Sequence, residues 1–131
     1  MNIKTVGVVG AGTMGNGIAQ VCAVAGLEVI MQDIDPEQVV RGLNTISGSL
    51  DRLIKKEKIG DAEKQSTLAN ITTTTALADL ADADIVIEAA TEREALKLDI
   101  FRQLDELCQP DAILASNSAV VDIEEDAFGG K

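Results

Sequence analysis

The chain has 131 residues and carries 11 Lys and Arg against 22 Asp and Glu, a formal net charge of −11. This length suits one domain with a real hydrophobic core and leaves no room in these residues for a second catalytic domain, and the acidic balance argues against nucleic acid, whose phosphates bind clustered Lys and Arg. The chain contains no histidine, which excludes imidazole general-base chemistry and His-ligated zinc within it, and we expect no metal site.

An apolar strand over residues 3–9 leads into Gly10-Ala11-Gly12-Thr13-Met14-Gly15 and then into a helix over about 13–25. In a G-x-G-x-x-G turn the first glycine permits the tight turn, the second lets the backbone approach a pyrophosphate, and the third lets the helix pack closely on the sheet. The helix start directs free N–H groups and the positive end of its dipole at the phosphates. Small residues are expected to let this helix approach the sheet: Gly15, Gly17, Ala19, Ala23 and Ala25.

Gly26 is expected to end this helix, and residues 27–32 are predicted to form a second strand that ends at Asp33, 21 residues after Gly12. An acid in this position can accept hydrogen bonds from an adenosine ribose 2′-hydroxyl, and its charge repels the 2′-phosphate of NADP. The alternative is that Asp33 only caps a turn. We favour the first interpretation, which predicts NAD as the cofactor.

Asp35 is predicted to cap a long helix that starts at Pro36, and Gln38 could complete a capping box with it. Apolar residues then advance by threes and fours to give one buried stripe of Val39, Leu43, Ile46, Leu50, Leu53 and Ile54. The helix ends in a basic cluster of Arg52, Lys55, Lys56 and Lys58. This cluster is either a solvated helix end that complements the dipole or a site for a phosphate-bearing ligand.

The second half of the chain continues the alternation of helices and strands. We expect a short helix over 62–68 capped by Asp61, a strand over 71–75, a helical turn over 77–80, a central strand over 84–89, a helix over 92–107 with a stripe of Leu96, Ile100, Leu104 and Leu107, and a strand over 112–115. This order predicts an α/β fold with a parallel, doubly wound sheet. Ligands of such sheets bind at the carboxyl ends of the strands. Four segments should therefore meet at one crevice: 10–15, 33–34, 88–92 and 116–117.

Cys22 and Cys108 lie far apart among apolar residues and form no Cys-x-x-Cys pair. We interpret both as buried free thiols, which favours the cytoplasm. Thr13, Asn16 and Gln20 interrupt the apolar beginning of the chain, so it does not read as a signal peptide. No stretch approaches the ~18–20 apolar residues of a membrane span. We therefore expect a soluble, cytoplasmic protein without a membrane partner.

The glycine turn, the segment Ile87-Glu88-Ala89-Ala90-Thr91-Glu92, Lys97, and Ala115-Ser116-Asn117 together give a pattern that resembles the NAD-binding domain of the 3-hydroxyacyl-CoA dehydrogenases, the 3-hydroxybutyryl-CoA branch especially. The likeness covers roughly residues 3–117. It implies a Rossmann-type, mainly parallel sheet with helices on both faces over residues 1–117, without the family's C-terminal helical domain. Residues 118–131 are expected to be a divergent acidic tail.

The resemblance also implies roles for individual residues. The positions expected to hold NAD are Gly10, Ala11, Gly12, Thr13, Met14, Gly15, Asp33, Ile34, Ala89, Ala90, Glu92, Lys97 and Asn117, with Asp33 on the adenosine ribose and Glu92 and Lys97 near the nicotinamide ribose. Ser49 and Lys56 fall at the family's CoA-contacting positions. From the residues alone, Glu92 is equally well an ordinary helix start, and Lys97 a solvated helix residue.

The sequence departs from the family after Asn117. The family reads Ser-Asn-Thr-Ser, whose last serine contacts the substrate hydroxyl, and Ala119 stands at that place here. The family's catalytic histidine and helical dimerisation domain follow beyond this point. The resemblance thus implies part of an enzyme, homodimeric when complete, that transfers hydride between NAD and an L-3-hydroxyacyl-CoA; this chain alone is expected to bind NAD without catalysis. The alternatives are a stand-alone regulatory dinucleotide-binding module, or the first domain of another NAD-dependent 3-hydroxyacid dehydrogenase.

Overall fold

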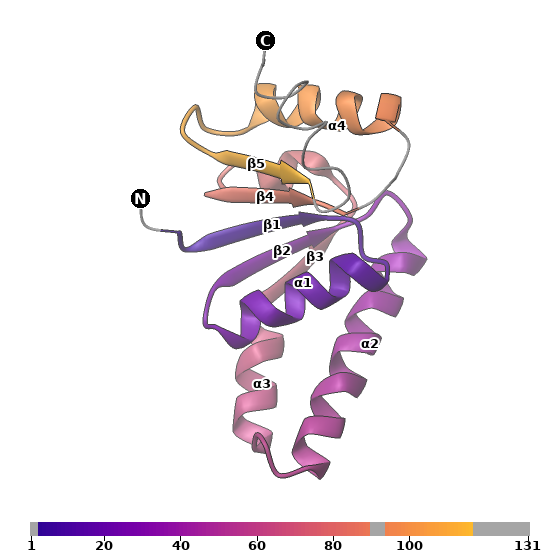
Figure 1. Ribbon diagram of the computed structural model, residues 1–131, viewed down its shortest axis with the longest axis vertical. Coiled ribbons are helices and arrows are strands. Elements are labelled where there is room, and N and C mark those ends of the chain that lie inside the picture. Colours follow the sequence, from indigo (N-terminus) through magenta and orange to yellow (C-terminus); the bar gives the residue numbers. More distant parts are fainter. Residues whose placement is uncertain (1–2, 90–93, 117–131) are drawn as a thin grey trace.

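A computed structural model describes residues 3–89 and 94–116, the side chains of 94–97 and 116 excepted. The elements in chain order are β1 (Thr5–Val9), α1 (Thr13–Val24), β2 (Glu28–Gln32), α2 (Pro36–Lys55), α3 (Asp61–Ala69), β3 (Ile71–Thr74), the 3₁₀ turn η1 (Leu77–Leu80), β4 (Ile85–Glu88), α4 (Glu94–Leu107) and β5 (Ile113–Ser116). The strands form one parallel sheet in the order β3-β2-β1-β4-β5 (Figure 1). The predicted fold class is confirmed. The strand expected to be central, β4, lies inside the sheet, but β1 takes the middle position.

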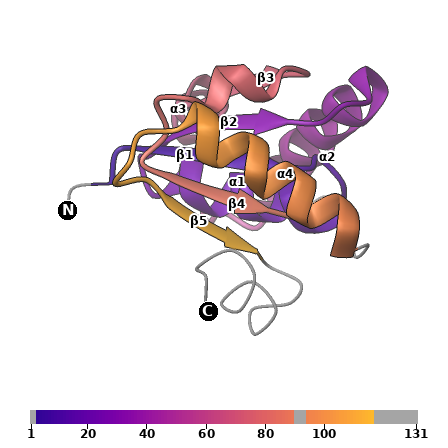
Figure 2. The ribbon, with the colours of Figure 1, turned by 90° about the horizontal axis from the view of Figure 1, so that it is seen from above.

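The crossovers place helices on both faces of the sheet. Helices α1, α2 and α3 lie on one face, and α4 lies on the other (Figures 1 and 2). The direction changes between β3 and β4, where the chain passes through η1 and returns beside β1. Because Val9 is in register with both Gln32 and Glu88, the carboxyl ends of β1, β2 and β4 are level with one another. This is the edge at which a ligand of a doubly wound sheet binds.

The ends of α1 agree with the sequence, but two of its small residues do not have the expected role. Gly26 adopts φ +93° and ends the helix. A Cβ at Gly17 would meet nothing within 4 Å, and Ala25 is exposed, so neither residue is needed for the approach of α1 to the sheet. The buried small residues of this helix, Gly15, Ala19 and Ala23, are four apart and therefore share the face that packs on the sheet, and neither Gly17 nor Ala25 belongs to this set.

The other helix starts are capped by backbone and acidic groups. The Asp35 side chain accepts from the Glu37 N–H at 2.9 Å, as a helix cap should. The N–H of Asp35 donates to the Asp33 carboxylate at 3.0 Å, whereas the expected capping box requires it to donate to the Gln38 side chain. Helix α3 begins at Asp61, which is therefore not its cap. The cap is Gly60, whose N–H donates to the Glu63 carboxylate at 3.2 Å.

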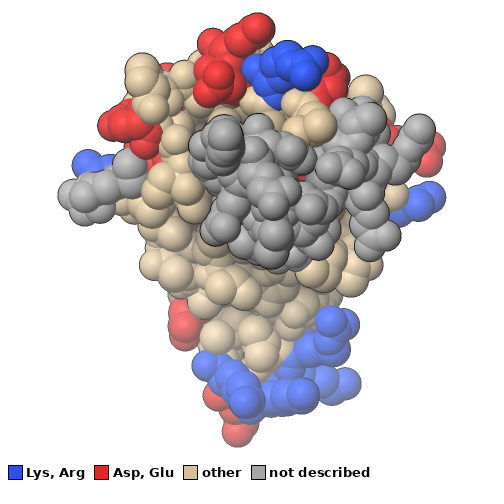
Figure 3. Space-filling view, turned by 45° about the horizontal axis from the view of Figure 1, so that its top comes forward, with Lys and Arg blue, Asp and Glu red and all other residues tan. Residues whose placement is uncertain are grey.

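Helices α2 and α3 form a hairpin that extends beyond the sheet, and basic side chains gather at its tip (Figure 3). We call this group, Arg52, Lys55, Lys56 and Lys58, the basic tip; all four are exposed. Nearby, Lys64 on α3 pairs with Asp51 on α2 at 2.5 Å. This ion pair joins the two arms of the hairpin, while the basic tip faces solvent.

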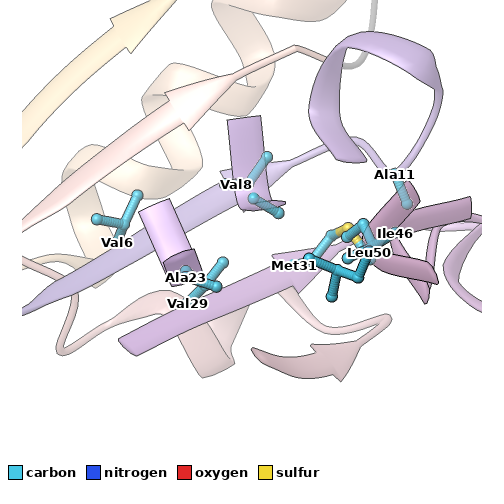
Figure 4. Close-up of a cluster of buried hydrophobic side chains, with 9 residues drawn as sticks. Val6, Val8, Ala11, Ala23, Val29, Met31, Ile46 and Leu50 are labelled. Atoms are coloured by element: carbon cyan, nitrogen blue, oxygen red, sulfur yellow. The ribbon is translucent and has the colours of Figure 1, made fainter. Parts of the chain in front are cut away.

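Two apolar clusters hold the layers together. On the face of α1 and α2, the side chains of β1 and β2 pack against the predicted stripe of α2, in which Ile46 and Leu50 are fully buried (Figure 4). On the other face, Leu104 of α4 packs with Leu80 and Val86. Leu107 was expected on the buried stripe of α4 but is 38% exposed. The stripe instead continues from Leu104 to Cys108, four residues later, and the Cys108 thiol lies 3.7 Å from the carbonyl oxygen of Leu80 in η1. Residues four apart share a helix face, so Cys108 lies on the same side of α4 as Leu104.

Candidate functional site

The glycine turn, the residues after β2 and the end of β4 meet at the carboxyl edge of the sheet, as predicted. Gly10 donates its N–H to the Gln32 carbonyl at 2.6 Å, and Ala89 donates to the Val9 carbonyl at 2.8 Å. Glu88 is in register with Val9 at the end of β4, and its side chain is fully buried, so it is not exposed to the crevice. Ala90, Glu92, the side chain of Lys97, and Asn117 lie outside the described residues.

Each glycine of the turn meets a different geometric requirement. Gly10 has φ +107°, a conformation that side-chain-bearing residues rarely adopt. A Cβ at Gly15 would lie 1.8 Å from the Gly10 carbonyl oxygen, so only glycine lets α1 start this close to the turn. A Cβ at Gly12 would meet nothing within 4 Å. The backbone at Gly12 therefore borders open space, as an approaching phosphate requires.

The start of α1 offers backbone N–H groups to an anion. Its first i→i−4 bond runs from the Asn16 N–H to the Gly12 carbonyl at 2.9 Å, so the N–H groups of Thr13, Met14 and Gly15 precede the helical ladder. The N-cap is Gly12, which has no side chain to accept from them. Thr13 and Met14 are exposed. A phosphate at this helix start would gain both these donors and the helix dipole without a basic side chain in the turn.

Asp33 links the end of β2 to the glycine turn. Its Oδ2 accepts from the Ala11 N–H at 2.9 Å, and its Oδ1 accepts from the Asp35 N–H at 3.0 Å. The carboxylate thus caps the turn at Asp35, the alternative considered from sequence, and also lies against the glycine turn. It is only partly buried, and a carboxylate has about four lone-pair sites, so it can accept further hydrogen bonds from a ligand.

A cavity of about 470 Å³ opens beside Asp33. Among the predicted cofactor residues, Gly10, Asp33 and Ile34 line it; its other walls come from Val9, Gln32, Thr75, Leu77, Asp99, Ile100 and Gln103. This volume is in the range of small-molecule sites. Its mixture of apolar side chains with the polar pair Asp99 and Gln103, joined at 2.9 Å, suits a flat heteroaromatic ring with polar edges. Ile34 is 87% exposed, so this apolar side chain is free to contact such a ring.

Sequence reasoning missed the wall formed by Thr75, Leu77 and α4. The available signal was the path of the chain. After β3 the chain must cross the sheet to reach β4, and this brings residues 75–77, and later α4, over the ends of β1 and β2. Identifying Asp99 and Gln103 as wall residues also needed the rotation of α4 about its axis.

The two positions expected to contact CoA lie away from this cavity. Ser49, on α2, accepts a hydrogen bond from the Gln20 side chain at 3.0 Å and so joins α2 to α1. Lys56 is the C-cap of α2 and belongs to the basic tip. A helix of 20 residues is about 30 Å long, so Lys56 lies roughly that far from the Asp33 end of α2. A ligand touching both ends would have to be extended.

The described residues hold two free thiols and one carboxylate with a lowered pKa, and no cluster of metal ligands. Within residues 3–89 and 94–116, no group of three or more His, Cys, Asp or Glu side chains could hold a metal ion. Cys22 and Cys108 are free and half-buried, and burial raises the pKa of each thiol. The described part of the chain has no helix that is both long and apolar enough to cross a membrane. At the opposite end of the sheet, the backbone N–H groups of Lys4 and Thr5 lower the pKa of Asp84.

Comparison with known proteins agrees with this geometry. The sequence model of the family described as "3-hydroxyacyl-CoA dehydrogenase, NAD binding domain" matches residues 5–127. A 3-hydroxybutyryl-CoA dehydrogenase of Bradyrhizobium diazoefficiens is 43% identical over 121 residues, which are 92% of this chain and 41% of the relative. One from Mycobacterium tuberculosis is 44% identical over 130 residues, 98% of this chain and 46% of the relative. The chain therefore spans less than half the length of these relatives.

A solved structure gives the same result. The (S)-3-hydroxybutyryl-CoA dehydrogenase PaaH1 of Ralstonia eutropha matches with a TM-score of 0.85 and 56% identity over 88% of this chain and 41% of that protein. The fold of this chain is therefore that of a dehydrogenase domain with a parallel sheet. The cofactor is NAD, and the chain belongs to the family of NAD-binding domains of 3-hydroxyacyl-CoA dehydrogenases.

Proposed function

We propose that this chain is the cofactor-holding part of a dehydrogenase that interconverts an L-3-hydroxyacyl-CoA, 3-hydroxybutyryl-CoA in particular, and its 3-oxoacyl-CoA. One observation carries the proposal: the Asp33 carboxylate reaches the Ala11 N–H, which places an acid, an uncapped helix start and a cavity side by side. When bound, NAD supplies the hydride acceptor of such a reaction. The residues of this chain bind and orient it.

The open backbone at Gly12 and the N–H groups of Thr13 and Met14 hold the pyrophosphate. Asp33 accepts the adenosine ribose hydroxyls with its remaining lone pairs and repels a 2′-phosphate. Ile34 and Ile100 line the 470 Å³ cavity and would provide apolar contacts to the adenine. By family resemblance, Ala89 and Ala90 line the dinucleotide, and Glu92, Lys97 and Asn117 lie toward its nicotinamide half.

The proton transfer is assigned to a histidine, the general base that the family resemblance implies. Removal of the substrate hydroxyl proton needs a general base within hydrogen-bond reach, and the sequence has no histidine. Ala119 also has no hydroxyl to contact the substrate. We assign the histidine to a polypeptide segment that is not among these 131 residues, and we expect the complete enzyme to be a cytoplasmic homodimer.

The basic tip is proposed to bind the phosphates of CoA. Its cations stand on exposed side chains at the end of α2, where the helix dipole is negative and adds nothing to anion binding, so affinity must come from the side chains themselves. Lys56→Ala should therefore weaken CoA binding. The control is Lys4→Ala, which removes one charge from an exposed lysine near the amino end of β1. Equal CoA affinities of the two variants would count against the tip, and absence of CoA binding would favour another 3-hydroxyacid dehydrogenase.

Titration of the purified chain with NADH tests the central proposal. The chain has no Trp or Tyr, so nicotinamide fluorescence is read directly against a dark protein background. We expect saturable NADH binding, weaker NADPH binding, and no oxidation of NADH by acetoacetyl-CoA above a buffer blank. NADH oxidation by the chain alone would refute the assignment of the base, and lack of NADH binding would refute the cofactor role. Binding without turnover even after the C-terminal helical domain of a family member is added in trans would favour the stand-alone regulatory module, for which the absence of histidine from these 131 residues is the supporting observation.

A further inference from the structure

Gly42 lies on α2 where that helix crosses the glycine turn, and it is buried. A Cβ at this position would lie 2.6 Å from the Ala11 carbonyl oxygen, 3.2 Å from the Ala11 Cβ and 3.2 Å from the Met31 methyl carbon. The Met31 methyl is the end of a flexible side chain and can move. The carbonyl oxygen belongs to the backbone of the turn, so glycine is what lets α2 lie this close to Ala11.

The Ala11 residue is enclosed on its remaining sides. Its N–H donates to Asp33 at 2.9 Å, and its carbonyl oxygen accepts from the Asn16 side chain at 3.5 Å. Ala11 is 1% exposed. The next residue, Gly12, borders open space. The turn is therefore braced by Asp33, Asn16 and α2, while its backbone at Gly12, where the phosphates are proposed to bind, borders open space.

A side chain at position 42 would displace the turn rather than the helix. On either side of Gly42, α2 is anchored by Val39 and Ile46, which are 8% and 0% exposed. Ordinary contact with the Ala11 oxygen begins at 3.4 Å, so about 0.8 Å of extra separation is needed. Space for a shift of the turn exists beside Gly12, where a Cβ would meet nothing within 4 Å. Such a displacement exceeds the spread of N–H···O distances, about 2.7–3.2 Å, over which a hydrogen bond to a phosphate stays effective.

We propose that Gly42 is a positioning residue for the dinucleotide: its missing side chain sets where the Ala11–Gly12 peptide, and with it the N–H groups at the start of α1, meet the pyrophosphate. The inference rests on the proposed function for its ligand. It differs from an ordinary packing role, in which a substitution at position 42 would change only the stability of the fold.

Gly42→Ala and Gly48→Ala form a matched pair for the test. Both glycines lie inside α2 and gain the same helix propensity as alanine, but a Cβ at Gly48 would meet only an Arg52 side-chain nitrogen at 3.9 Å. Three quantities are measured for each variant: the NADH dissociation constant by fluorescence, the backbone amide spectrum without ligand, and urea unfolding by circular dichroism. The binding constant is corrected for the folded fraction taken from the unfolding curve.

We expect Gly48→Ala to bind NADH within twofold of the unmutated chain. Gly42→Ala should raise the dissociation constant about tenfold or more, since sub-ångström misplacement of binding groups carries costs of this size. Without ligand it should also shift the amide resonances of Ala11 and Gly12 that Gly48→Ala leaves in place. NADH affinities of the two variants within twofold of each other, or unshifted turn amides, would overturn the inference.

Two further outcomes are also decisive. If Gly42→Ala lowers the folded fraction, the double variant Gly42→Ala/Gly48→Ala is compared with Gly48→Ala alone, because the second alanine adds helix propensity. Complete failure of the double variant to fold would make Gly42 a core residue and overturn the positioning role. Where the unmutated chain fails to bind NADH, the proposed function fails, while the ligand-free amide spectra still decide whether position 42 places the turn.

Discussion

Gly15→Ala provides the sharpest test of the strand-turn-helix geometry. The added Cβ would lie 1.8 Å from the Gly10 carbonyl oxygen and 2.7 Å from its carbon, both backbone atoms of a turn held at φ +107°. Overpacking costs about 1–3 kcal/mol, and a backbone contact this short belongs at the upper end of that range. Alanine returns about 1 kcal/mol of helix propensity. We therefore expect the free energy of unfolding to fall by roughly 2 kcal/mol, and NADH binding to be lost with the turn geometry.

Gly17→Ala is the control on the same helix. A Cβ there would meet nothing within 4 Å, so the helix propensity of alanine should appear without a clash and stabilise the chain by about 0.5–1 kcal/mol. Urea unfolding followed by circular dichroism measures both variants, since the chain lacks Trp and Tyr. If Gly15→Ala were as stable as Gly17→Ala, the close approach of α1 to the turn would not be a constraint and the reasoning would be wrong.

Three further predictions concern single side chains. Asp33→Ala should weaken NADH binding by about 1–3 kcal/mol, the cost of losing charged hydrogen bonds, and narrow the gap to NADPH in parallel fluorescence titrations; equal NADH and NADPH affinities of the unmutated chain would contradict this. Asp84 has a pKa held below its ordinary value of 3.8 by the N–H groups of Lys4 and Thr5, so it stabilises the fold above that value and the contribution is lost as the pH falls through the lowered pKa. Between about pH 5 and pH 3 the free energy of unfolding should therefore fall more steeply with pH for the unmutated chain than for Asp84→Asn. Equal pH dependence of the two free energies would contradict this role of Asp84. Leu50→Ala should cost about 2–5 kcal/mol because Leu50 is fully buried, whereas Leu107→Ala, at a residue 38% exposed, should cost much less in the same urea unfolding assay; similar losses would contradict the assigned core.

Local patterns carried most of the prediction of the fold. The alternation of strands and helices, the cap at Asp35 and the stripe of α2 follow from periodicity and from side-chain hydrogen bonds within a few residues, so the sequence shows them directly. The parallel arrangement follows from the right-handed crossovers. The strand order does not follow from such local rules: the apolar run of β4 predicts an interior strand, but not that its neighbours are β1 and β5.

The candidate site divides in the same way. The glycine turn and Asp33 were predicted from spacing, because a tight turn and an acid at the end of the next strand are local features. The hydrogen bond from Ala11 to Asp33 could not be predicted, since it depends on the register of β1 against β2. The wall made by Thr75, Leu77 and α4 depends on how the chain packs after it crosses the sheet.

The sequence by itself determined that glycines stand at positions 10, 12, 15, 17, 42 and 48 and that the first three form a dinucleotide-binding pattern. Only the tertiary structure decided which of them the fold requires. Gly15 and Gly42 each lie against a backbone carbonyl of the turn, while Gly17 faces open space and Gly48 has only a distant side chain nearby. The physical reason is that a missing Cβ matters only through what lies opposite it, and the atoms opposite come from residues distant in sequence or from another element.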